Sequence, residues 1–367
     1  MDRAKAFQRK KHEAGFVGIH WPKEWGGRGG TQIQNVIYNQ EEANYDVPQG
    51  VFVIGLGMCI PTLMTYAPQE QLQRYVPPAL RGDEVWCQLF SEPSGGSDVA
   101  GLRTRAERDG DEWVINGQKI WTSGAHYSDF GLIIVRTDPN VPKHEGITAF
   151  FLDMKSKGVE VRPIHQMSGA SHFNEVFFTD VRVPDSQRIG GVGQGWKVAI
   201  TTLMNERLAV GEIRRPDVDD LLELCRVVEL GGRPAIADRA VRERIAEWYA
   251  RSQGLTYTRL RTMTALSRGD TPGPENSIAK VVNASKQQEM ASFGMDLLGM
   301  AGMVMDPQLA PMHALFQSAL LSSPGGRIAG GSDEIMRNII AERVLGLPGD
   351  IRVDKDRPFN KLPTGSR

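Results

Sequence analysis

Cysteine is scarce in this sequence of 367 residues: only Cys59, Cys87 and Cys225 occur, and no two of them form a Cys-x-x-Cys pair. The seven histidines show neither a His-x-His nor a His-Glu-x-x-His spacing. These absences argue against a disulfide-built scaffold and against a metal site, and they favour a reducing compartment.

Long hydrophobic runs are missing as well. The most apolar stretch, Val51–Ile60, lies between Pro48 and Pro61 and is far shorter than the roughly 20 residues of a membrane-spanning helix. It predicts a buried helix instead. The opening stretch, Met1–Lys11, is highly charged and lacks the apolar centre of a secretory signal. We therefore expect a cytoplasmic protein without a membrane segment.

Neither sign of charge dominates. The sequence has 43 basic residues (Lys and Arg) against 44 acidic ones, for a formal net charge of −1. This balance argues against a nucleic-acid-binding protein and against attraction to an anionic membrane. Hydrophobic residues make up 40% of the chain and charged residues 24%, which is ordinary for a globular protein. At roughly 100–200 residues per domain, the length predicts two or three domains.

The periodicity of apolar residues changes twice along the chain. Residues 1–85 show helical patterns, residues 86–195 show short alternating runs typical of strands, and residues 196–347 are helical again. The polar tail, residues 348–367, is expected to wrap on the surface or to be mobile. We predict a mainly helical α+β fold: an N-terminal helical domain, a middle antiparallel β domain that is barrel-like, and a C-terminal helical bundle.

Local signals predict where single elements end. Val76-Pro77-Pro78 is expected to stop a helix that begins at Gln69. Asp109-Gly110 and Asn116-Gly117 are turn dipeptides, so two hairpins are predicted between short strands at residues 103–107, 112–115 and 119–122. No strand leads into a Gly-x-Gly-x-x-Gly segment followed by a helix, which excludes a Rossmann-type nucleotide site.

Two polar segments in the middle zone carry candidate binding chemistry. Gln88–Asp98 contains two adjacent glycines, which let a ligand approach the backbone closely, flanked by three serine hydroxyls. Taken alone, it is equally well explained as a surface loop. Asn116–Gly124 brings a tryptophan and two hydroxyl side chains to the end of a strand. For a lone tryptophan, a place in the core is the commoner meaning.

Taken together, the two segments resemble the acyl-CoA dehydrogenase family. The family pattern is Thr/Ser-Glu-Pro-x-Ala/Gly-Gly-Ser-Asp, followed by Asn-Gly-x-Lys and then by Trp with a hydroxyl residue. The loop Trp21–Gly27 and the element Gly195–Lys197 also look like the family. The resemblance covers nearly the whole chain and implies the family's fold, with a middle β-barrel and a C-terminal four-helix bundle. It also implies that the chain starts inside the usual first domain, without the first helix.

The resemblance implies FAD as the cofactor and an acyl-CoA thioester as the substrate. The backbone around Ser91 would bind the pyrimidine side of the flavin, Trp121 would pack beside the ring system, and Ser123 would place its hydroxyl at N5. Gly96 and Ser97 would contact the pyrophosphate, and Ser97 would also touch the thioester ligand. The implied cofactor contacts are Gln88, Phe90, Ser91, Gly96, Ser97, Trp121, Thr122, Ser123, Ser332 and Glu334.

The family reaction requires a carboxylate that removes an α-proton of the thioester. Many members carry a glutamate directly before a Gly-Thr-Ser-Gln element, but this chain has Gly330 there. A minority place the glutamate before an arginine on the first bundle helix, where this chain has Glu206 and Arg207. The resemblance thus implies Glu206 as the base, with Asn205, Arg207 and the N–H of Gly330 near the thioester. From the residues alone, a solvated Glu–Arg pair on a helix is the alternative.

Two elements at the adenosine end of the cofactor depart from the family pattern. Glu229–Arg233 stands where Arg-x-Phe-Gly is usual, and Asp296–Met300 replaces Gln-x-x-Gly-Gly. The family implies a homodimer or homotetramer that passes electrons to an electron-transferring flavoprotein. The departures leave open a heteromer with a related subunit, in which this chain contributes to an FAD site with little or no activity of its own. They resemble bacterial members that act on bulky acyl-CoAs.

Overall fold

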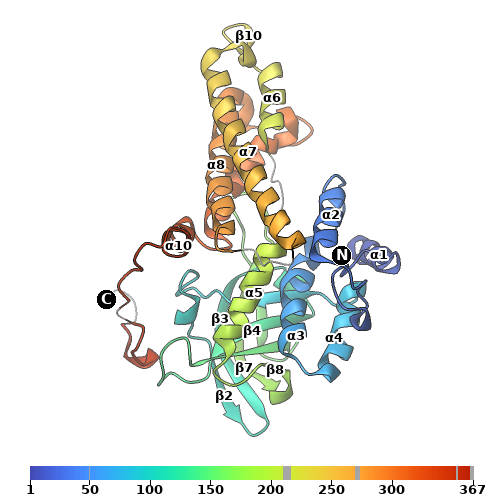
Figure 1. The fold of residues 1–367 in the computed structure, drawn as a ribbon, viewed down its shortest axis with the longest axis vertical. Coiled ribbons are helices and arrows are strands. Elements are labelled where there is room, and N and C mark those ends of the chain that lie inside the picture. The colour runs from blue at the N-terminus through green and yellow to red at the C-terminus, as the bar shows by residue number, and fades with distance from the viewer. Residues whose placement is uncertain (49, 210–215, 269–272, 353, 364–367) are drawn as a thin grey trace. The chain divides into compact units, whose positions relative to one another are not determined.

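The computed structural model describes residues 1–363 apart from residues 49, 210–215, 269–272 and 353, and the side chains of residues 206–209 also lie outside the described part. The chain forms two compact units (Figure 1). The first contains residues 1–166, 170–211 and 351–367, and the second contains residues 167–169 and 212–350. The predicted order of helices, strands and helices is confirmed.

The first unit begins with helices. The second of them starts with a capping box, in which the Thr31 side chain accepts from the Gln34 N–H and the Gln34 side chain accepts from the Thr31 N–H. The apolar run predicted as a buried helix is helical, with a π-helical turn at Gly55–Cys59. The α-helices are α1 (Asp2–Glu13), α2 (Gln32–Glu42), α3 (Ile60–Tyr66) and α4 (Gln69–Arg81).

The prediction that Val76-Pro77-Pro78 stops a helix is wrong. Helix α4 runs through both prolines and ends before Gly82, which has a left-handed φ of 76°. An internal proline costs a helix about 3 kcal/mol. Here Val76 and Leu80 are fully buried, and each large apolar side chain recovers about 1.5–3 kcal/mol. The Pro78 carbonyl also accepts the N–H of Asp83 at 2.9 Å, which closes the helix end.

Eight strands form one sheet in the order β6-β7-β3-β2-β4-β5-β8, and β1 pairs with β4. Most neighbours are antiparallel as predicted, but β1 and β2 pair in parallel with β4, so the sheet is mixed and the prediction of a purely antiparallel sheet is wrong. The strands are β1 (Trp86–Leu89), β2 (Arg105–Asp109), β3 (Glu112–Ser123), β4 (Phe130–Arg136), β5 (Ile147–Asp153), β6 (Val159–Pro163), β7 (Phe173–Pro184) and β8 (Arg188–Ile189).

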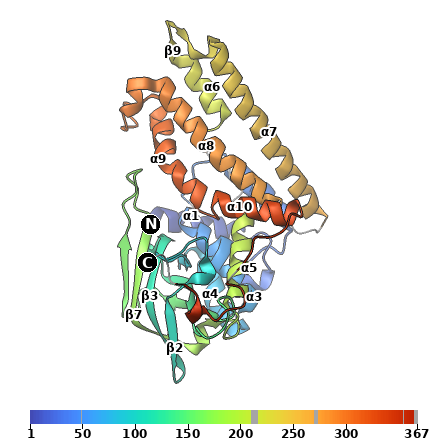
Figure 2. The ribbon, with the colours of Figure 1, turned by 90° about the vertical axis from the view of Figure 1, so that its left-hand side faces the viewer.

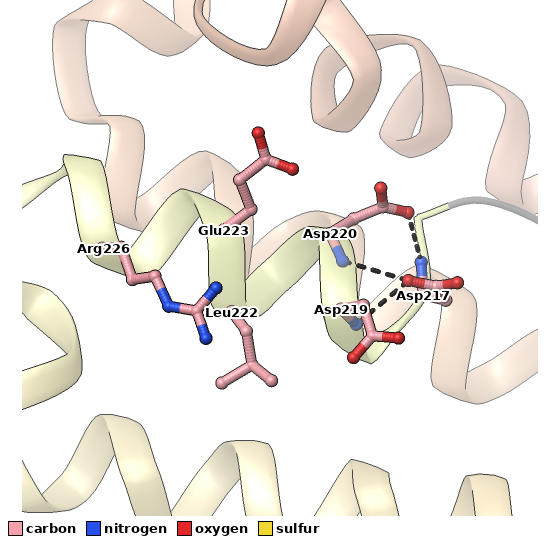
Figure 3. Close-up of a pocket in the computed structure, with 6 residues that line it drawn as sticks. All are labelled: Asp217, Asp219, Asp220, Leu222, Glu223 and Arg226. Atoms are coloured by element: carbon pink, nitrogen blue, oxygen red, sulfur yellow. Dashed lines mark hydrogen bonds between the residues drawn. The ribbon is translucent and has the colours of Figure 1, made fainter.

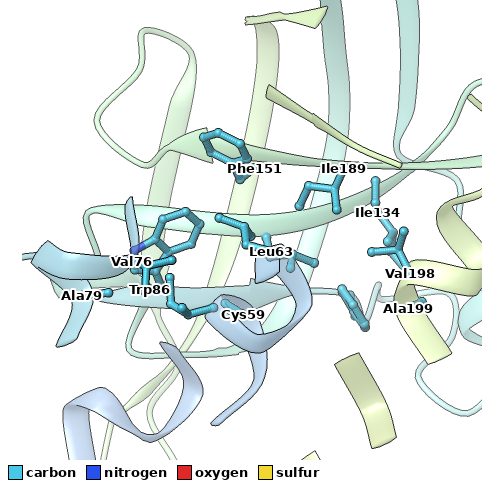
Figure 4. Close-up of a cluster of buried hydrophobic side chains, with 14 of the residues drawn as sticks. Cys59, Leu63, Val76, Ala79, Trp86, Ile134, Phe151, Ile189, Val198 and Ala199 are labelled. Atoms are coloured by element: carbon cyan, nitrogen blue, oxygen red, sulfur yellow. The ribbon is translucent and has the colours of Figure 1, made fainter. Parts of the chain in front are cut away.

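Successive side chains of the central strands point to opposite faces, and both faces are buried. Ile134 of β4 and Phe151 of β5 belong to a core that also contains Leu63 of α3 and Val198 of α5 (Gly195–Ala209) (Figure 4). Their neighbours, such as Phe150, enter a second core formed by the strands themselves. Burial on both faces explains why β4 is an almost continuous apolar run.

The hairpin predicted at Asn116-Gly117 is wrong, whereas the one at Asp109-Gly110 is confirmed by the antiparallel pairing of β2 with β3. Strand β3 continues through Asn116-Gly117, and its register with β7 shifts there. Gly117 has a φ of 149°, and a Cβ atom at this position would lie 2.6 Å from the Cα of Thr104. The Asn116 side chain accepts from the N–H of Asp180 at 2.9 Å. The dipeptide therefore builds a bulge and not a turn.

The second unit is helical, and α8 packs against both α7 and α9 (Figure 2). Gly294 of α8 allows close packing, because a Cβ atom there would lie 2.2 Å from the ring of Phe316. Trp248 and Met290 fill the same core. In the part of the chain that the structure describes, no helix is long and apolar enough to cross a membrane. The helices are α6 (Val218–Val227), α7 (Arg239–Ser267), α8 (Asn276–Leu298), α9 (Leu315–Ile328) and α10 (Asp333–Ile339).

Candidate functional site

The two segments singled out in the middle zone are adjacent in the first unit. The chain leaves β1 after Leu89 and forms a tight turn, in which Glu92 and Gly95 exchange two backbone hydrogen bonds of 3.0 and 3.2 Å. The Ser91 carbonyl accepts from the N–H of Ile120 at 2.9 Å. Because Ile120 directly precedes Trp121 in β3, this bond places the backbone of Ser91 next to that of Trp121.

A buried ion pair fixes the turn to β3. Lys119 Nζ lies 2.7 Å from Glu92 Oε1, and the two side chains are 0% and 4% exposed. Lys119 also donates to the Phe90 carbonyl at 3.1 Å, and Glu92 accepts from the backbone N–H groups of Arg103 and Thr104 at 2.6 and 3.0 Å. Burial alone would raise the pKa of Glu92, but the charge of Lys119 and the backbone donors hold this pKa below its ordinary value.

Sequence reasoning assigned no role to Glu92 or Lys119, although both lie inside the segments that carry the family resemblance. The available signal was a glutamate and a lysine at fixed places in two polar motifs, 27 residues apart. Their pairing depends on β1 and β3 meeting in space, which no local pattern reveals.

Trp121 is held in an unusual conformation on the same strand. Its φ is 60°, in the left-handed region, and the register between β3 and β7 shifts between Lys119 and Thr122. A left-handed conformation costs a bulky residue about 1–3 kcal/mol. The side chain is 54% exposed and touches Phe173 edge-on, with ring centroids 5.9 Å apart. The strand therefore presents a large aromatic ring to its surroundings instead of burying it.

The residues that follow Trp121 are polar, and one of them is unsatisfied. Thr122 is buried, its carbonyl accepts from Asn174 Nδ2 at 2.9 Å, and its hydroxyl has no hydrogen-bond partner among the described residues. Leaving such a group unpaired costs about 1–3 kcal/mol. Ser123 is half-buried at the end of β3. An unpaired buried hydroxyl calls for an explanation, and a ligand that contacts this end of β3 is one.

These features fit FAD, which offers a planar aromatic system with a polar edge and an anionic pyrophosphate. Trp121 supplies a face for the ring and Thr122 an unused hydroxyl. Gly96 leaves open space, because the nearest atom to a Cβ atom there would be the Ser91 hydroxyl at 3.8 Å. Gln88 is half-buried on β1, Phe90 is buried in the core and Ser97 is exposed.

The predicted base lies on α5, also in the first unit. Glu206 and Arg207 belong to this helix, but their side chains are outside the described part, so their roles stay predictions. The neighbouring Asn205 donates a long hydrogen bond of 3.5 Å to the hydroxyl of Thr62. Thr62 in turn shares a 3.0 Å hydrogen bond with Thr202, which fastens α5 to α3.

The remaining predicted contacts lie in the second unit, before and at the start of α10. Gly330 and Gly331 have left-handed φ values of 66° and 94°, which glycine adopts without strain. Ser332 caps the helix by accepting from the Ile335 N–H at 3.4 Å, and Glu334 is exposed. The residue that anchors this turn is Asp333, which sequence reasoning did not single out.

Asp333 is buried and lies 2.7 Å from Arg327 and 3.4 Å from Lys280. Arg327 also donates to Gln288 at 2.9 Å, so α8, α9 and α10 meet at one ionic cluster. A buried acidic residue in the first turn of α10 suits the positive end of the helix dipole. The start of α10, directly after Gly330-Gly331, is therefore held to α8 and α9.

The two segments that depart from the family pattern have simple local structures. Glu229–Leu230 and Arg233–Pro234 form a short antiparallel hairpin, β9 and β10, whose turn residues Gly231 and Gly232 have φ values of 59° and 76°. Asp296–Leu298 ends α8, and Gly299 follows as its C-cap.

A surface cavity of about 490 Å³ lies elsewhere in the second unit (Figure 3). Asp217 and Asp220 form the capping box of α6 there. Its carboxylates outnumber its single arginine and would repel the phosphates of FAD or of coenzyme A. Among the described residues, no cluster of His, Cys, Asp and Glu could hold a metal ion. The cavity is lined by Asp217, Asp219, Asp220, Leu222, Glu223 and Arg226, none of which is a predicted site residue.

Three family models match the chain in order. They are the acyl-CoA dehydrogenase N-terminal domain at residues 1–83, the middle domain at residues 87–181 and the C-terminal domain at residues 193–345. The predicted three-domain fold is thereby confirmed.

Similar proteins carry the same family name. The acyl-CoA dehydrogenase IpdE1 of Mycobacterium tuberculosis is 37% identical over 353 residues, which are 96% of this chain and 90% of that protein. FadE34 of the same organism is 37% identical over 92% of this chain, but the chain spans only 45% of its length.

Two solved structures share the fold closely. The Tcur3481-Tcur3483 steroid ACAD has a TM-score of 0.84 and 28% identity, and the ChsE4-ChsE5 complex of M. tuberculosis has a TM-score of 0.82 and 29% identity. Each alignment covers 95% of this chain and 90% of the other chain.

Proposed function

The chain belongs to the acyl-CoA dehydrogenase family, whose members are FAD-dependent oxidoreductases, and from this premise we propose that it binds FAD and oxidises an acyl-CoA thioester to the trans-2-enoyl-CoA. The observation that carries the proposal is the end of β3, where Trp121 is exposed in a left-handed conformation and the buried hydroxyl of Thr122 has no partner among the described residues. Without a ligand, the unpaired Thr122 hydroxyl costs about 1–3 kcal/mol.

Bound FAD would supply the acceptor for the β-hydride at its N5 atom. The chain's own residues position the two reactants and move the α-proton. Ser91 and Trp121 would hold the flavin ring, and Ser123 would place its hydroxyl near N5. Glu206 removes the α-proton as general base. The family resemblance implies that the N–H of Gly330 would donate to the thioester carbonyl and so stabilise the negative charge that develops there.

Two observations support Glu206 as the base. It lies on α5 directly before Arg207, at the register that a minority of the family uses, and Gly330 cannot supply a carboxylate at the commoner position. Asn205 and Arg207 flank the ligand in this proposal. A base on α5 comes from the first unit, the same unit that carries the flavin segments.

We infer that the acyl group is bulky, of the steroid side-chain type. A structure of 28% identity and TM-score 0.84 is described as a steroid ACAD. A glycine at position 330 removes a side chain from the place where the thioester is proposed to bind. Electrons would leave through an electron-transferring flavoprotein.

A second candidate is an FAD-site-contributing subunit of a heteromeric dehydrogenase that has little activity alone. The altered segments at Glu229–Arg233 and Asp296–Met300 favour it, since these places hold the adenosine end of FAD in the family. The ChsE4-ChsE5 complex, a similar structure, consists of two differently named chains. A homo-oligomer with one FAD per chain that turns over acyl-CoA would exclude this candidate.

The base assignment is tested with Glu206→Gln. The variant is expected to keep bound FAD while turnover of a good substrate falls by about 10²–10⁴-fold, the usual loss when a general base is removed. Glu160→Gln, which changes an exposed glutamate of β6, is the matched control and is expected to keep full turnover. Turnover within about tenfold of the unchanged protein would show that another group is the base. A purified protein that takes up no FAD would contradict the whole proposal.

A further inference from the structure

The C-terminal tail returns to the β domain within the first unit and docks on the loop between β4 and β5 (Figure 1). The N–H of Phe359 donates to the Val141 carbonyl and the N–H of Asn360 to the Pro139 carbonyl, both at 2.9 Å. Pro358 forms an isolated antiparallel bridge with Pro142. The contact is therefore a hydrogen-bonded attachment and not a loose overlay.

Two side chains of the tail contact two buried cations of the β domain. Asp354 Oδ2 lies 2.6 Å from Lys143 Nζ, whose side chain is only 11% exposed. The ring of Phe359 lies 3.8 Å from the guanidinium carbon of Arg136, which is also buried. The Arg136 Nε atom has no hydrogen-bond partner among the described residues, so the aromatic face is an important part of its environment.

The same two cations hold the proposed flavin segment. Lys143 Nζ lies 2.9 Å from Oδ1 of Asp98, the last residue of that segment. Arg136 Nη2 donates to the carbonyls of Ala100 and Leu102 at 2.6 and 3.3 Å, just after the segment. The Asp354 contact thus reaches the flavin segment through Lys143, and the Phe359 contact reaches the residues just after it through Arg136.

The electrostatics of Lys143 agree with this geometry. Burial alone would lower the pKa of Lys143, but the hydrogen bonds that it donates to Asp354 and Asp98 raise this pKa above its ordinary value. The hydrogen bond from Lys143 lowers the pKa of Asp354 in turn. The lysine therefore remains charged between two carboxylates at neutral pH, one from the tail and one from the flavin segment.

We propose that the C-terminal tail is a strap that positions the flavin segment: Asp354 and Phe359 hold Lys143 and Arg136 in place, and these two cations fix residues 98–102. This inference rests on the proposed binding of FAD to Gln88–Asp98. Asp354 and Phe359 are positioning residues. Without them, Lys143 loses one of its two carboxylates and Arg136 loses its aromatic cover, so both cations hold residues 98–102 less firmly. The segment must then be ordered when FAD binds, which weakens binding.

The test measures the affinity of the full-length apoprotein for FAD by flavin fluorescence. The double variant with Asp354→Asn and Phe359→Leu is expected to bind FAD about five- to tenfold more weakly, at the lower end of couplings between linked sites. The single variant Phe359→Trp keeps Asp354 and an aromatic face for Arg136. It is expected to bind FAD as tightly as the unchanged protein. Asp356→Asn removes an exposed tail carboxylate and is the matched control, expected to leave the affinity unchanged. Circular dichroism of each apoprotein verifies its fold.

A second readout follows from thermodynamic reciprocity. If docking of the tail strengthens FAD binding, FAD binding must strengthen docking of the tail by the same factor. Saturating FAD is expected to slow tryptic cleavage after Lys355 in the tail, which a purely structural attachment would not do. Equal FAD affinity of all variants, or a cleavage rate independent of FAD, would overturn the strap while leaving the proposed function intact. A full-length protein that binds no FAD would overturn both.

Discussion

Replacing Glu92 by glutamine is expected to destabilise the β domain strongly. The change keeps the size of the side chain but leaves the ammonium of Lys119, 0% exposed, without its carboxylate. In the unchanged protein, Lys119, Arg103 and Thr104 donate to the two oxygens of Glu92. Glutamine would replace one of these oxygens by an NH₂ group, which is a donor facing other donors. A buried charge without a partner is among the costliest single changes in a protein.

The magnitude follows from the burial of the pair. Removing one partner of a buried ion pair costs about 3–5 kcal/mol. For a unit of this size, each kcal/mol lowers Tm by about 2–4 °C, so the expected loss is about 6–20 °C. The matched control is Glu160→Gln, whose partner Arg162 is 56% exposed, and its Tm is expected to stay unchanged.

The pH dependence gives a second check. The folded-state pKa of Glu92 lies below its ordinary value of 4.5. Its stabilisation is therefore fully present above pH 4.5 and is lost as the pH falls through the lowered folded-state pKa. Thermal unfolding followed by circular dichroism should show the largest Tm difference near neutral pH and a smaller one below pH 4. A Tm loss under about 2 °C at neutral pH would refute the role given to this pair.

Three further changes test other parts of the site. Thr122→Val removes a buried hydroxyl that has no partner among the described residues. It is expected to raise the Tm of the flavin-free protein and to weaken FAD binding. A lower Tm of the flavin-free variant would contradict this. Gly117→Ala places a methyl group 2.6 Å from the Cα of Thr104 and is expected to cost about 1–3 kcal/mol in urea unfolding, whereas a neutral effect would show that the bulge can relax. Asp333→Asn weakens the link to Arg327 and should accelerate amide hydrogen exchange at residues 330–334, and unchanged exchange would remove its anchoring role.

Sequence patterns predicted the elements that depend on local periodicity. The apolar run of β5 and the Asp109-Gly110 turn each follow from a few neighbouring residues. The flavin segments were found because their motifs are contiguous and resemble a known family. Local signals failed where a distant contact decides the outcome. The burial of Val76 and Leu80 carries α4 through two prolines, and the closeness of Thr104 turns a hairpin dipeptide into a bulge.

The site residues also divide into those that local motifs predicted and those that depend on distant contacts. Trp121 and Thr122 were predicted as cofactor contacts, but the left-handed backbone of one and the unsatisfied hydroxyl of the other depend on how β3 pairs with β7. The bridge from Asp354 through Lys143 to Asp98 joins residues more than two hundred positions apart in the chain. No periodicity in the sequence could have indicated it.

The central claim is that this chain uses bound FAD to oxidise an acyl-CoA. Anaerobic titration of the FAD-loaded protein with a panel of acyl-CoAs, from short linear chains to steroid side chains, tests it most directly through the visible absorbance of the flavin. The band is expected to bleach with at least one bulky acyl-CoA in the unchanged protein and to persist in Glu206→Gln. A flavin band that no acyl-CoA in the panel bleaches would contradict the claim.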